Sequence, residues 1–331
     1  MTPAELSRTV WHAVCRAVED DALPGPVPDR VTVERPRPGG RGDYATNVAL
    51  RLAGPAGRPP REVAEILRVR VAATPGIDRL VDRIEITGPG FLNFTLAPDR
   101  APALVRAVLR AGTRYGHGDT LAGTATAFAP AAEPRAALWT RTVMELLRAQ
   151  GGAAATGTDG AERLAVVPVA DPGALAALGP DAARWALLAT AARDRPYTGP
   201  GLFVQRESNP LFRTRYAYAR TRALARGAAQ LGIAPAYTAP EPTHTTLLTA
   251  LGDHPAVLEA AARLRAPDRL ARHLEHTAEA FLRFQETARP LPLGDEKPSA
   301  AHRSRLALAE AAGAVLAGGL SLLGVDAPEH L

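Results

Sequence analysis

The spacing of apolar positions predicts a chain made mostly of helices. Apolar residues recur every three or four positions through most of the sequence, which is typical of helices with one buried face. The helices that this predicts cover residues 3–20, 43–53, 59–73, 135–150, 180–192, 209–230, 243–251, 255–265, 268–288 and 299–318. Prolines and glycines between the later ones indicate turns. From residue 180 onward the pattern predicts a helical bundle.

Strands are predicted in two places. Val81–Thr87 and Phe91–Leu96 are rich in β-forming residues and flank Gly88-Pro89-Gly90, which indicates a hairpin. Further along, residues 124–128, 135–150 and 163–169 have the order strand, helix, strand, with a Gly- and Ala-rich connection at 151–161. That is a single βαβ unit. The predicted fold class is α+β.

Composition narrows the class of protein. The chain has 331 residues, of which 46% are hydrophobic and 22% charged, as in ordinary globular proteins. No run approaches 18 apolar residues, and the amphipathic N-terminal stretch carries acids, so neither a membrane span nor a signal peptide is expected. Cys15 is the only cysteine, which excludes an internal disulfide and a cysteine-built zinc site. These features predict a cytoplasmic protein.

The distribution of charge suggests a partner. The net charge of +5 divides into +3 over residues 1–119, −1 over 120–175 and +3 over 176–331. All basic residues except Lys297 are arginines. Two basic regions around a neutral middle suit a polyanion that touches both. An arginine-rich compositional bias without any partner explains the charge equally well.

Several motifs, in order, carry a resemblance to a known family. "GDYATNVALRLA" (42–53) and "ITGPGFLNFTL" (86–96) resemble the N-terminal additional domain of arginyl-tRNA synthetases. "GPDAARWALL" (179–188) resembles the Asp-Ala-Leu-Arg motif of their anticodon-binding domain, with Ala183 in place of the leucine. "NPLFRTRYAYARTRAL" (209–224) and "GGLSLLGVDAPEHL" (318–331) resemble the body and end of that domain. The resemblance implies a protein that binds tRNA.

The middle of the chain departs from the family. A Rossmann catalytic domain with a His-x-Gly-His pair and a lysine-bearing loop is expected there, and no histidine occurs between His117 and His244. About 55 residues are available, against on the order of 150 for a six-stranded doubly wound sheet. We therefore expect no enzyme activity and a vestigial βαβ middle. The predicted domains are 1–118, an N-terminal additional-domain-like lobe; 119–177, a degenerate remnant; and 178–331, the anticodon-binding-like helical domain.

The helix at 209–230 holds most of the candidate RNA-binding residues. On a helical wheel Arg215, Tyr218, Arg222 and Arg226 share one face, while Phe212, Tyr216, Ala219 and Ala223 share another, expected to be buried. The resemblance implies that the arginines, Arg213 included, contact RNA phosphates and that Tyr218 stacks on an unpaired base. Arg215 and Tyr218 stand where the family more often has glutamine and histidine. The alternative is a solvated charged face.

"PGFLNF" (89–94) supplies the other candidates. Phe91 and Asn93 point to the same face of a strand, because side chains alternate along it. The resemblance implies that both approach a base of the tRNA D-loop, with the Asn93 amide reading its edge. The alternative is a tight turn that buries the aromatic residues, with Asn93 at a strand edge.

No cofactor and no metal site are predicted. His273 and His276 lie one turn apart with Glu279 beyond them, a spacing that can share an ion, but no third ligand can be named. A structural helix is the better interpretation.

The sequence thus predicts a non-catalytic tRNA-binding protein, selective for RNA of the tRNA(Arg) type, with no membrane or DNA partner. Two alternatives remain. One is an enzyme that uses aminoacyl-tRNA, and the other is an interaction partner of a true synthetase or another tRNA-using protein.

Overall fold

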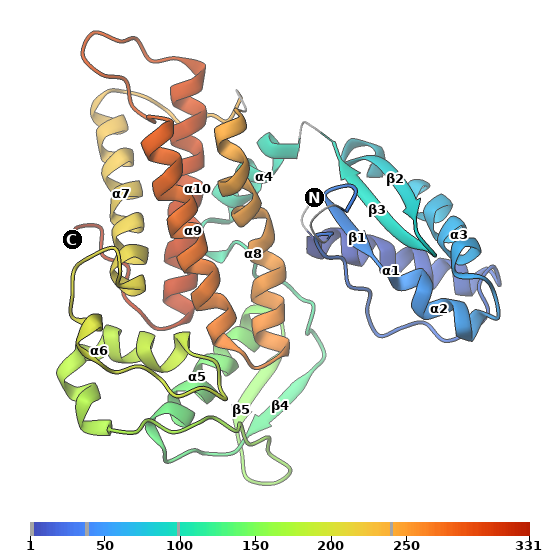
Figure 1. The fold of residues 1–331 in the computed structure, drawn as a ribbon, viewed down its shortest axis with the longest axis horizontal. Coiled ribbons are helices and arrows are strands. Elements are labelled where there is room, and N and C mark those ends of the chain that lie inside the picture. The colour runs from blue at the N-terminus through green and yellow to red at the C-terminus, as the bar shows by residue number, and fades with distance from the viewer. Residues whose placement is uncertain (1–2, 37–39, 98–99, 239–240) are drawn as a thin grey trace. The chain divides into compact units, whose positions relative to one another are not determined.

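Two units divide the chain, Met1–Ala103 and Leu104–Leu331. The computed structural model describes residues 3–36, 40–97, 100–238 and 241–331. Each unit has its own helices and its own small sheet, shown in Figure 1. The predicted α+β class is confirmed.

A three-stranded antiparallel sheet and three helices form the first unit. The sheet has the order β1-β3-β2, so the hairpin strand β3 is central. The elements are α1 (Pro3–Glu19), β1 (Tyr44–Thr46), α2 (Val48–Ala56), α3 (Pro60–Ala72), β2 (Val81–Thr87) and β3 (Phe91–Leu96). Leu92, Phe94 and Leu96 alternate inward along β3 and join the core formed with the helices. Phe91 and Asn93, at the alternate positions of the strand, therefore belong to the opposite face.

The turn of the hairpin depends on glycine. Gly90 has a φ of 153°, and a Cβ there would lie 2.8 Å from the carbonyl oxygen of Pro60. Only a residue without a side chain fits this close approach between the hairpin and the start of α3. The turn thus fixes where β3, and with it Phe91, begins.

The second unit is a helical bundle with a two-stranded parallel sheet at one end (Figure 1). Helices α7, α8, α9 and α10 pack on one another, and α5 and α6 pack against α8 and α9. Helix α4 (Arg100–Ala111) begins at the end of the first unit and continues into the second. The other elements are β4 (Ala125–Phe128), α5 (Pro134–Ala149), β5 (Ala153–Thr156), α6 (Pro172–Ala189), α7 (Pro210–Gln230), α8 (Thr245–Arg263), α9 (Pro267–Thr287) and α10 (Ala300–Leu322).

Helix α10 is long and apolar enough to cross a membrane, with a mean hydropathy of 1.3 over its most apolar window. However, 67% of that window is buried inside the bundle, where α10 packs on α7 and α9. Gly313 permits the contact with α7, since a Cβ there would lie 2.5 Å from the Thr221 hydroxyl oxygen. The apolar character of α10 is therefore explained by its place in the core of the bundle.

Three predicted elements differ from the structure. Residues 43–53 are not one helix, because Tyr44 and Thr46 form the edge strand β1 and pair with β3 before α2 begins. The second strand of the βαβ unit comes earlier in the chain than predicted. It is β5, which pairs with β4, and the chain reaches it through a turn at Gly151, whose φ is 81°. Residues 163–169 form no strand. The two predicted helices 243–251 and 255–265 are the single helix α8, which contains Pro255. The internal proline removes only one backbone donor, and packing in the bundle outweighs that loss.

Arg135 ties the middle segment to the bundle. Its guanidinium is fully buried and donates to five backbone carbonyls, those of Val167, Leu187, Thr190, Ala191 and Asp194. It also lies over the Trp139 ring, 5.3 Å from its centroid. Burial lowers the pKa of Arg135, and the nearby acids Glu133 and Asp194 oppose this. One buried cation on α5 thus joins the extended segment after β5 to the end of α6 and to the residues that follow α6.

Candidate nucleic-acid interface

Helix α7 starts at a well-formed cap. The Asn209 side chain accepts hydrogen bonds from the backbone N–H groups of Leu211 and Phe212, and its amide donates to the carbonyls of Leu202 and Val204. Pro210 follows at the first helical position, where a missing N–H costs nothing. The cap fixes both the start of the helix and the loop before it.

The buried face of α7 differs from the predicted one. It is made mainly of small residues, namely Leu211, Thr214, Ala217, Ala219, Thr221, Leu224 and Ala228. The two threonines are satisfied within the helix: Thr214 donates to the Pro210 carbonyl and Thr221 to that of Tyr218. Among the residues predicted to be buried, Ala219 is buried, but Tyr216 is 38% exposed. The Tyr216 ring stacks on the ring of half-buried Phe212, with 5.9 Å between the ring centroids. Because the hydroxyls of Thr214 and Thr221 donate to carbonyls of their own helix, these two threonines can be buried against the core without unpaired hydrogen-bonding groups.

Arg215, Tyr218, Arg222 and Arg226 do lie together on the face away from the core. All four are half-buried, because residues 325–331 pass over them. Arg222 Nε donates to Glu329 Oε1 at 3.1 Å, and Arg226 Nη1 is 3.6 Å from Glu329 Oε2. Arg215 lies 3.6 Å from an Asp181 oxygen and 3.9 Å from one of Asp326. The predicted cationic face exists, and acids of the same chain already neutralise part of it.

Tyr218 and Arg213 have separate environments. Burial raises the pKa of the Tyr218 hydroxyl, the Arg222 charge lowers it, and the Glu329 and Asp326 carboxylates raise it further. Arg213 does not join this group. Its Nη1 donates to the Glu207 carbonyl, and its charge acts on Glu275 of α9, whose pKa is raised by burial. The structure thus brings four of the five predicted α7 residues together and places Arg213 apart.

An open cleft of about 670 Å³ lies in the first unit, on the face of the sheet opposite the core. Phe91 and Asn93 line it, as do the exposed residues Arg41 and Arg51. Arg35 also lines the cleft and stacks over the Tyr44 ring at 5.3 Å. Glu34 is the only acid among the lining residues of the described chain. A cationic cleft with one exposed aromatic ring suits a nucleotide, whose base can stack while its phosphates meet arginines. Arg35, Arg41 and Arg51 were not predicted as site residues, because they are spread over a segment in which the sequence has no periodic pattern.

Asn93 is less exposed than expected. Its side chain is on the predicted face, together with Phe91, but the residue is only 5% exposed, whereas Phe91 is 39% exposed. The expectation of an exposed amide was wrong because β3 is the central strand, with β1 and β2 on either side. The Asn93 amide nitrogen donates to the Thr87 hydroxyl at 2.7 Å and to the Phe91 carbonyl at 3.3 Å.

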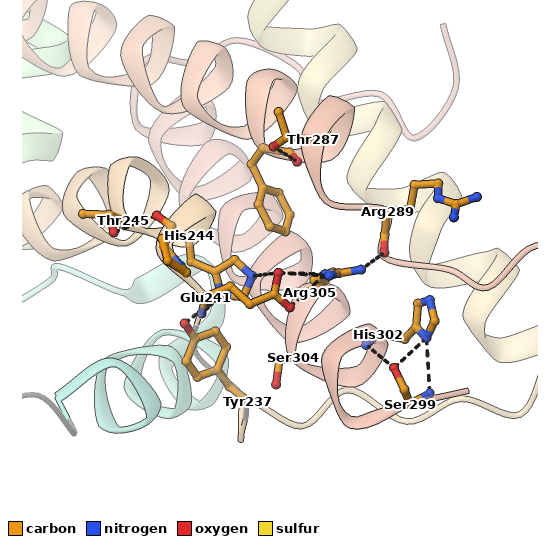
Figure 2. Close-up of polar contacts among 12 residues, drawn as sticks. Tyr237, Glu241, His244, Thr245, Thr287, Arg289, Ser299, His302, Ser304 and Arg305 are labelled. Carbon is orange, nitrogen blue, oxygen red and sulfur yellow. Dashed lines mark hydrogen bonds and ion pairs between the residues drawn. The ribbon is translucent and has the colours of Figure 1, made fainter. Parts of the chain in front are cut away.

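A polar network in the bundle was not foreseen from the sequence. The Tyr237 hydroxyl lies 3.0 Å from Nδ1 of fully buried His244. Two Arg305 nitrogens donate to the Glu241 carboxylate at 2.9 and 3.1 Å. These residues are drawn in Figure 2. Burial raises the pKa of Tyr237 to about 12 and lowers that of His244. Tyrosine, histidine and carboxylate can serve acid–base chemistry, but here they join the segment before α8 to α10. We interpret the network as structural.

The two histidines that suggested an ion are also structural. His273 is buried against His254, with 5.2 Å between ring centroids, whereas His276 is exposed. Among the described residues no group of three or more histidine, cysteine or acidic side chains is placed to hold a metal ion. Burial lowers the pKa of both His254 and His273, so these rings pack as neutral groups.

Comparison with known families finds two matches in the expected order. The family described as "Arginyl tRNA synthetase N terminal domain" matches residues 5–96, which include the cleft. The family described as "DALR anticodon binding domain" matches residues 214–331, which include Arg215, Tyr218, Arg222 and Arg226 of α7 and residues 325–331.

Individual relatives agree with this assignment. The chain is 53% identical over 117 residues to the arginine--tRNA ligase of Frankia alni and 47% identical over 126 residues to that of Renibacterium salmoninarum. These matches cover 35% and 37% of this chain but only 20% and 22% of the two ligases. The fold is similar to the arginyl-tRNA synthetases of Thermus thermophilus (TM-score 0.67, 12% identity, 100% of both chains covered) and Plasmodium falciparum (TM-score 0.63, 8% identity, 99% of both chains covered).

These comparisons contradict the prediction that the chain is not an enzyme. Both curated relatives are named as ligases, and the fold matches synthetases over its whole length. The prediction relied on an absent histidine motif, a missing lysine loop and a short middle segment. An absent motif removes one means of stabilising a charged transition state, and other donors can serve the same purpose. Neither a missing catalytic domain nor a non-catalytic role is shown.

The two family matches, the ligase relatives and the fold agree with one another. They also agree with the motifs read from the sequence. The chain is a relative of the arginyl-tRNA synthetases and carries their N-terminal domain followed by their DALR anticodon-binding domain.

Proposed function

We propose that this chain binds tRNA of the tRNA(Arg) type through two surfaces. One is the arginine face of α7, formed by Arg215, Arg222 and Arg226 with Tyr218. The other is the cleft around Phe91 and Asn93. The observation that carries the proposal is that the arginine face lies in the region matched by an anticodon-binding domain. A cytoplasmic location, as predicted from the sequence, fits this role.

The roles of the residues follow from their surroundings. Guanidinium groups donate two parallel hydrogen bonds to phosphate oxygens, so Arg215, Arg222 and Arg226 are assigned to the RNA backbone. Tyr218 lies among them and offers a ring for stacking on an unpaired base. Arg213 donates to the Glu207 carbonyl, and its charge acts on Glu275, so we assign it a supporting role within the bundle.

In the cleft the aromatic ring and the amide have different tasks. Phe91 is exposed enough to stack on a base. Asn93 is held by Thr87, so its orientation is fixed before any base arrives. Arg41 and Arg51, both exposed at the cleft, are assigned to the phosphates on either side of that base. We expect this surface to supply selectivity and the α7 face to supply affinity.

The test is a binding titration of the full chain with a tRNA(Arg) transcript and an unrelated tRNA at several salt concentrations. Phosphate-driven binding weakens linearly on a log–log plot, with a slope near the number of phosphates neutralised. We expect a slope of several units and tighter binding of tRNA(Arg).

A protein partner, such as a synthetase, is the main alternative use of these surfaces. Binding of a protein depends less steeply on salt than binding of RNA. An undetectable interaction with either tRNA at low salt would contradict the proposal.

A further inference from the structure

Residues 325–331 are held against the α7 arginine face. Val325 is buried, and its N–H donates to the Leu320 carbonyl at 2.9 Å. The Asp326 N–H donates to an Asp181 carboxylate oxygen of α6 at 3.3 Å. Figure 1 shows the end of this segment, marked C, beside α7. The backbone thus places Asp326 and Glu329, the two acids of the segment, above the helix.

Glu329 makes the main contact with the arginines. Its Oε1 accepts a hydrogen bond from Arg222 Nε at 3.1 Å, and its Oε2 lies 3.6 Å from Arg226 Nη1. Arg226 Nη2 also lies 3.4 Å from the Glu329 carbonyl oxygen and from His330 Nδ1. The Glu329 carboxylate therefore pairs with two of the three arginines that are assigned to RNA phosphates.

The fit of this carboxylate is loose. Arg226 Nη1 and Arg215 Nε are shielded from solvent, yet neither has a hydrogen-bond partner among the described residues. The side chains of Arg222 and Arg226 are both 39% exposed, and that of Glu329 is 50% exposed. Exposed pairs of this kind contribute little stability. A phosphate with three acceptor oxygens can satisfy donors that the carboxylate leaves unpaired.

We propose that residues 325–331 act as a latch that competes with RNA for the α7 arginines. RNA phosphates displace Glu329 from Arg222 and Arg226, and the latch closes again when the RNA leaves. The inference rests on the proposed function, because it concerns the same arginines. Every RNA that binds these arginines must displace the same carboxylate, so the latch lowers each affinity by the same factor. RNA with few contacts elsewhere then binds too weakly to remain on the protein, whereas RNA that also fills the cleft of the first unit still binds.

The test compares Glu329→Gln with wild type in the full chain. Glutamine keeps the size of the side chain and removes the charge that competes with phosphate. Glu145→Gln is the matched control: Glu145 on α5 also pairs with an exposed arginine, Arg148, so the change in net charge is the same. Affinities for a tRNA(Arg) transcript and for a single-stranded uridine oligonucleotide are measured at low and moderate salt. Urea unfolding confirms that each variant is folded.

We expect Glu329→Gln to bind both RNAs about three- to tenfold more tightly at low salt, from the release of pairs worth up to about a factor of five each. The fold-gain is similar for the oligonucleotide and the tRNA, because both displace the same carboxylate. Glu145→Gln changes either affinity less than twofold. In wild type, amide hydrogen exchange of residues 325–331 becomes faster when tRNA is added, because the segment leaves α7.

Other outcomes separate the two proposals. Weaker binding by Glu329→Gln means that the carboxylate orients the arginines for RNA, which overturns the latch and leaves the function intact. Affinity equal to that of Glu145→Gln, or slower exchange of residues 325–331 with tRNA, also overturns it. Absence of RNA binding by wild type and both variants overturns the proposed function together with the latch.

Discussion

The side-chain amide of Asn93 donates a hydrogen bond to the Thr87 hydroxyl across the β2–β3 hairpin at 2.7 Å. The amide nitrogen, which also donates to the Phe91 carbonyl, is therefore occupied. No hydrogen bond to the side-chain oxygen Oδ1 of Asn93 occurs among the described residues. That oxygen is the group with which Asn93 can accept a hydrogen bond from an N–H group on a base edge. Asn93 was predicted to pair with a base through both its amide nitrogen and its amide oxygen. In the structure only the oxygen is available, and its orientation is fixed.

Asn93→Ala should weaken tRNA binding selectively. The preferred tRNA should lose about 1 kcal/mol, because only the matched base donates a hydrogen bond to the side-chain oxygen of Asn93. The free energy of unfolding should fall by about 1 kcal/mol from the lost bond to Thr87. Binding titrations against several tRNAs and urea unfolding measure the two effects.

Thr87→Val is the control for this variant. It removes the hydroxyl that orients the amide but leaves Asn93 in place, so it should affect binding less than Asn93→Ala. If Asn93→Ala weakens every tRNA alike, or none, then the hairpin does not read a base.

Arg222→Ala should weaken binding of all RNAs alike. Each lost phosphate contact should reduce the log–log salt slope by about one unit. Arg148→Ala, which removes an arginine from an equally exposed pair on α5, should leave the slope unchanged. A selective loss for one tRNA would show that Arg222 contacts a base instead of the backbone.

Arg135→Met should destabilise the second unit strongly. Five backbone carbonyls lose their donor at once, and at roughly 1 kcal/mol for each bond the free energy of unfolding should fall by at least about 3 kcal/mol. Arg141→Met, an exposed position on the same helix, should change it by less than about 0.5 kcal/mol. If the two variants unfold at similar urea concentrations, then the five carbonyls form hydrogen bonds with water in place of Arg135, and the prediction is wrong.

Acid should destabilise the bundle through its buried histidines. Burial, and then the charge of His117, lower the pKa of fully buried His254 to about 4, whereas an unfolded histidine titrates near 6.5. Below pH 6.5 the unfolded chain binds a proton that the folded chain does not, so stability falls as the pH falls from about 6.5 to about 4.

The loss due to His254 should reach about 2 kcal/mol at pH 5 relative to pH 7. The fully buried His273 ring, whose pKa is also lowered, should add to it. Urea unfolding of wild type and His254→Gln at both pH values measures the difference between them. A pH dependence that the substitution leaves unchanged would assign the effect to other groups.

Much of the fold could be predicted because local patterns and global packing agree. The β2–β3 hairpin and helices α1, α3, α7, α9 and α10 follow the spacing of apolar residues. The second strand of the βαβ unit could not be placed, since "AAAT" at β5 has no strand-like composition and is fixed by its pairing with β4. Packing, and not propensity, determines such an element.

The candidate site was predicted only in part, for a similar reason. The common face of Arg215, Tyr218, Arg222 and Arg226 follows from helical geometry alone. Its pairing with Glu329 joins positions 107 residues apart along the chain, and no local pattern indicates it. The buried state of Asn93 depends on β1, an edge strand that was predicted as part of a helix.

The most direct test of the account is to sequence the RNA that co-purifies with the chain from cells, beside the double variant Arg222→Ala, Arg226→Ala. We predict that tRNA is strongly enriched, with tRNA(Arg) foremost, and that the enrichment is lost in the double variant. RNA from the wild-type chain that is no richer in tRNA than a mock purification would contradict the claim that this chain binds tRNA.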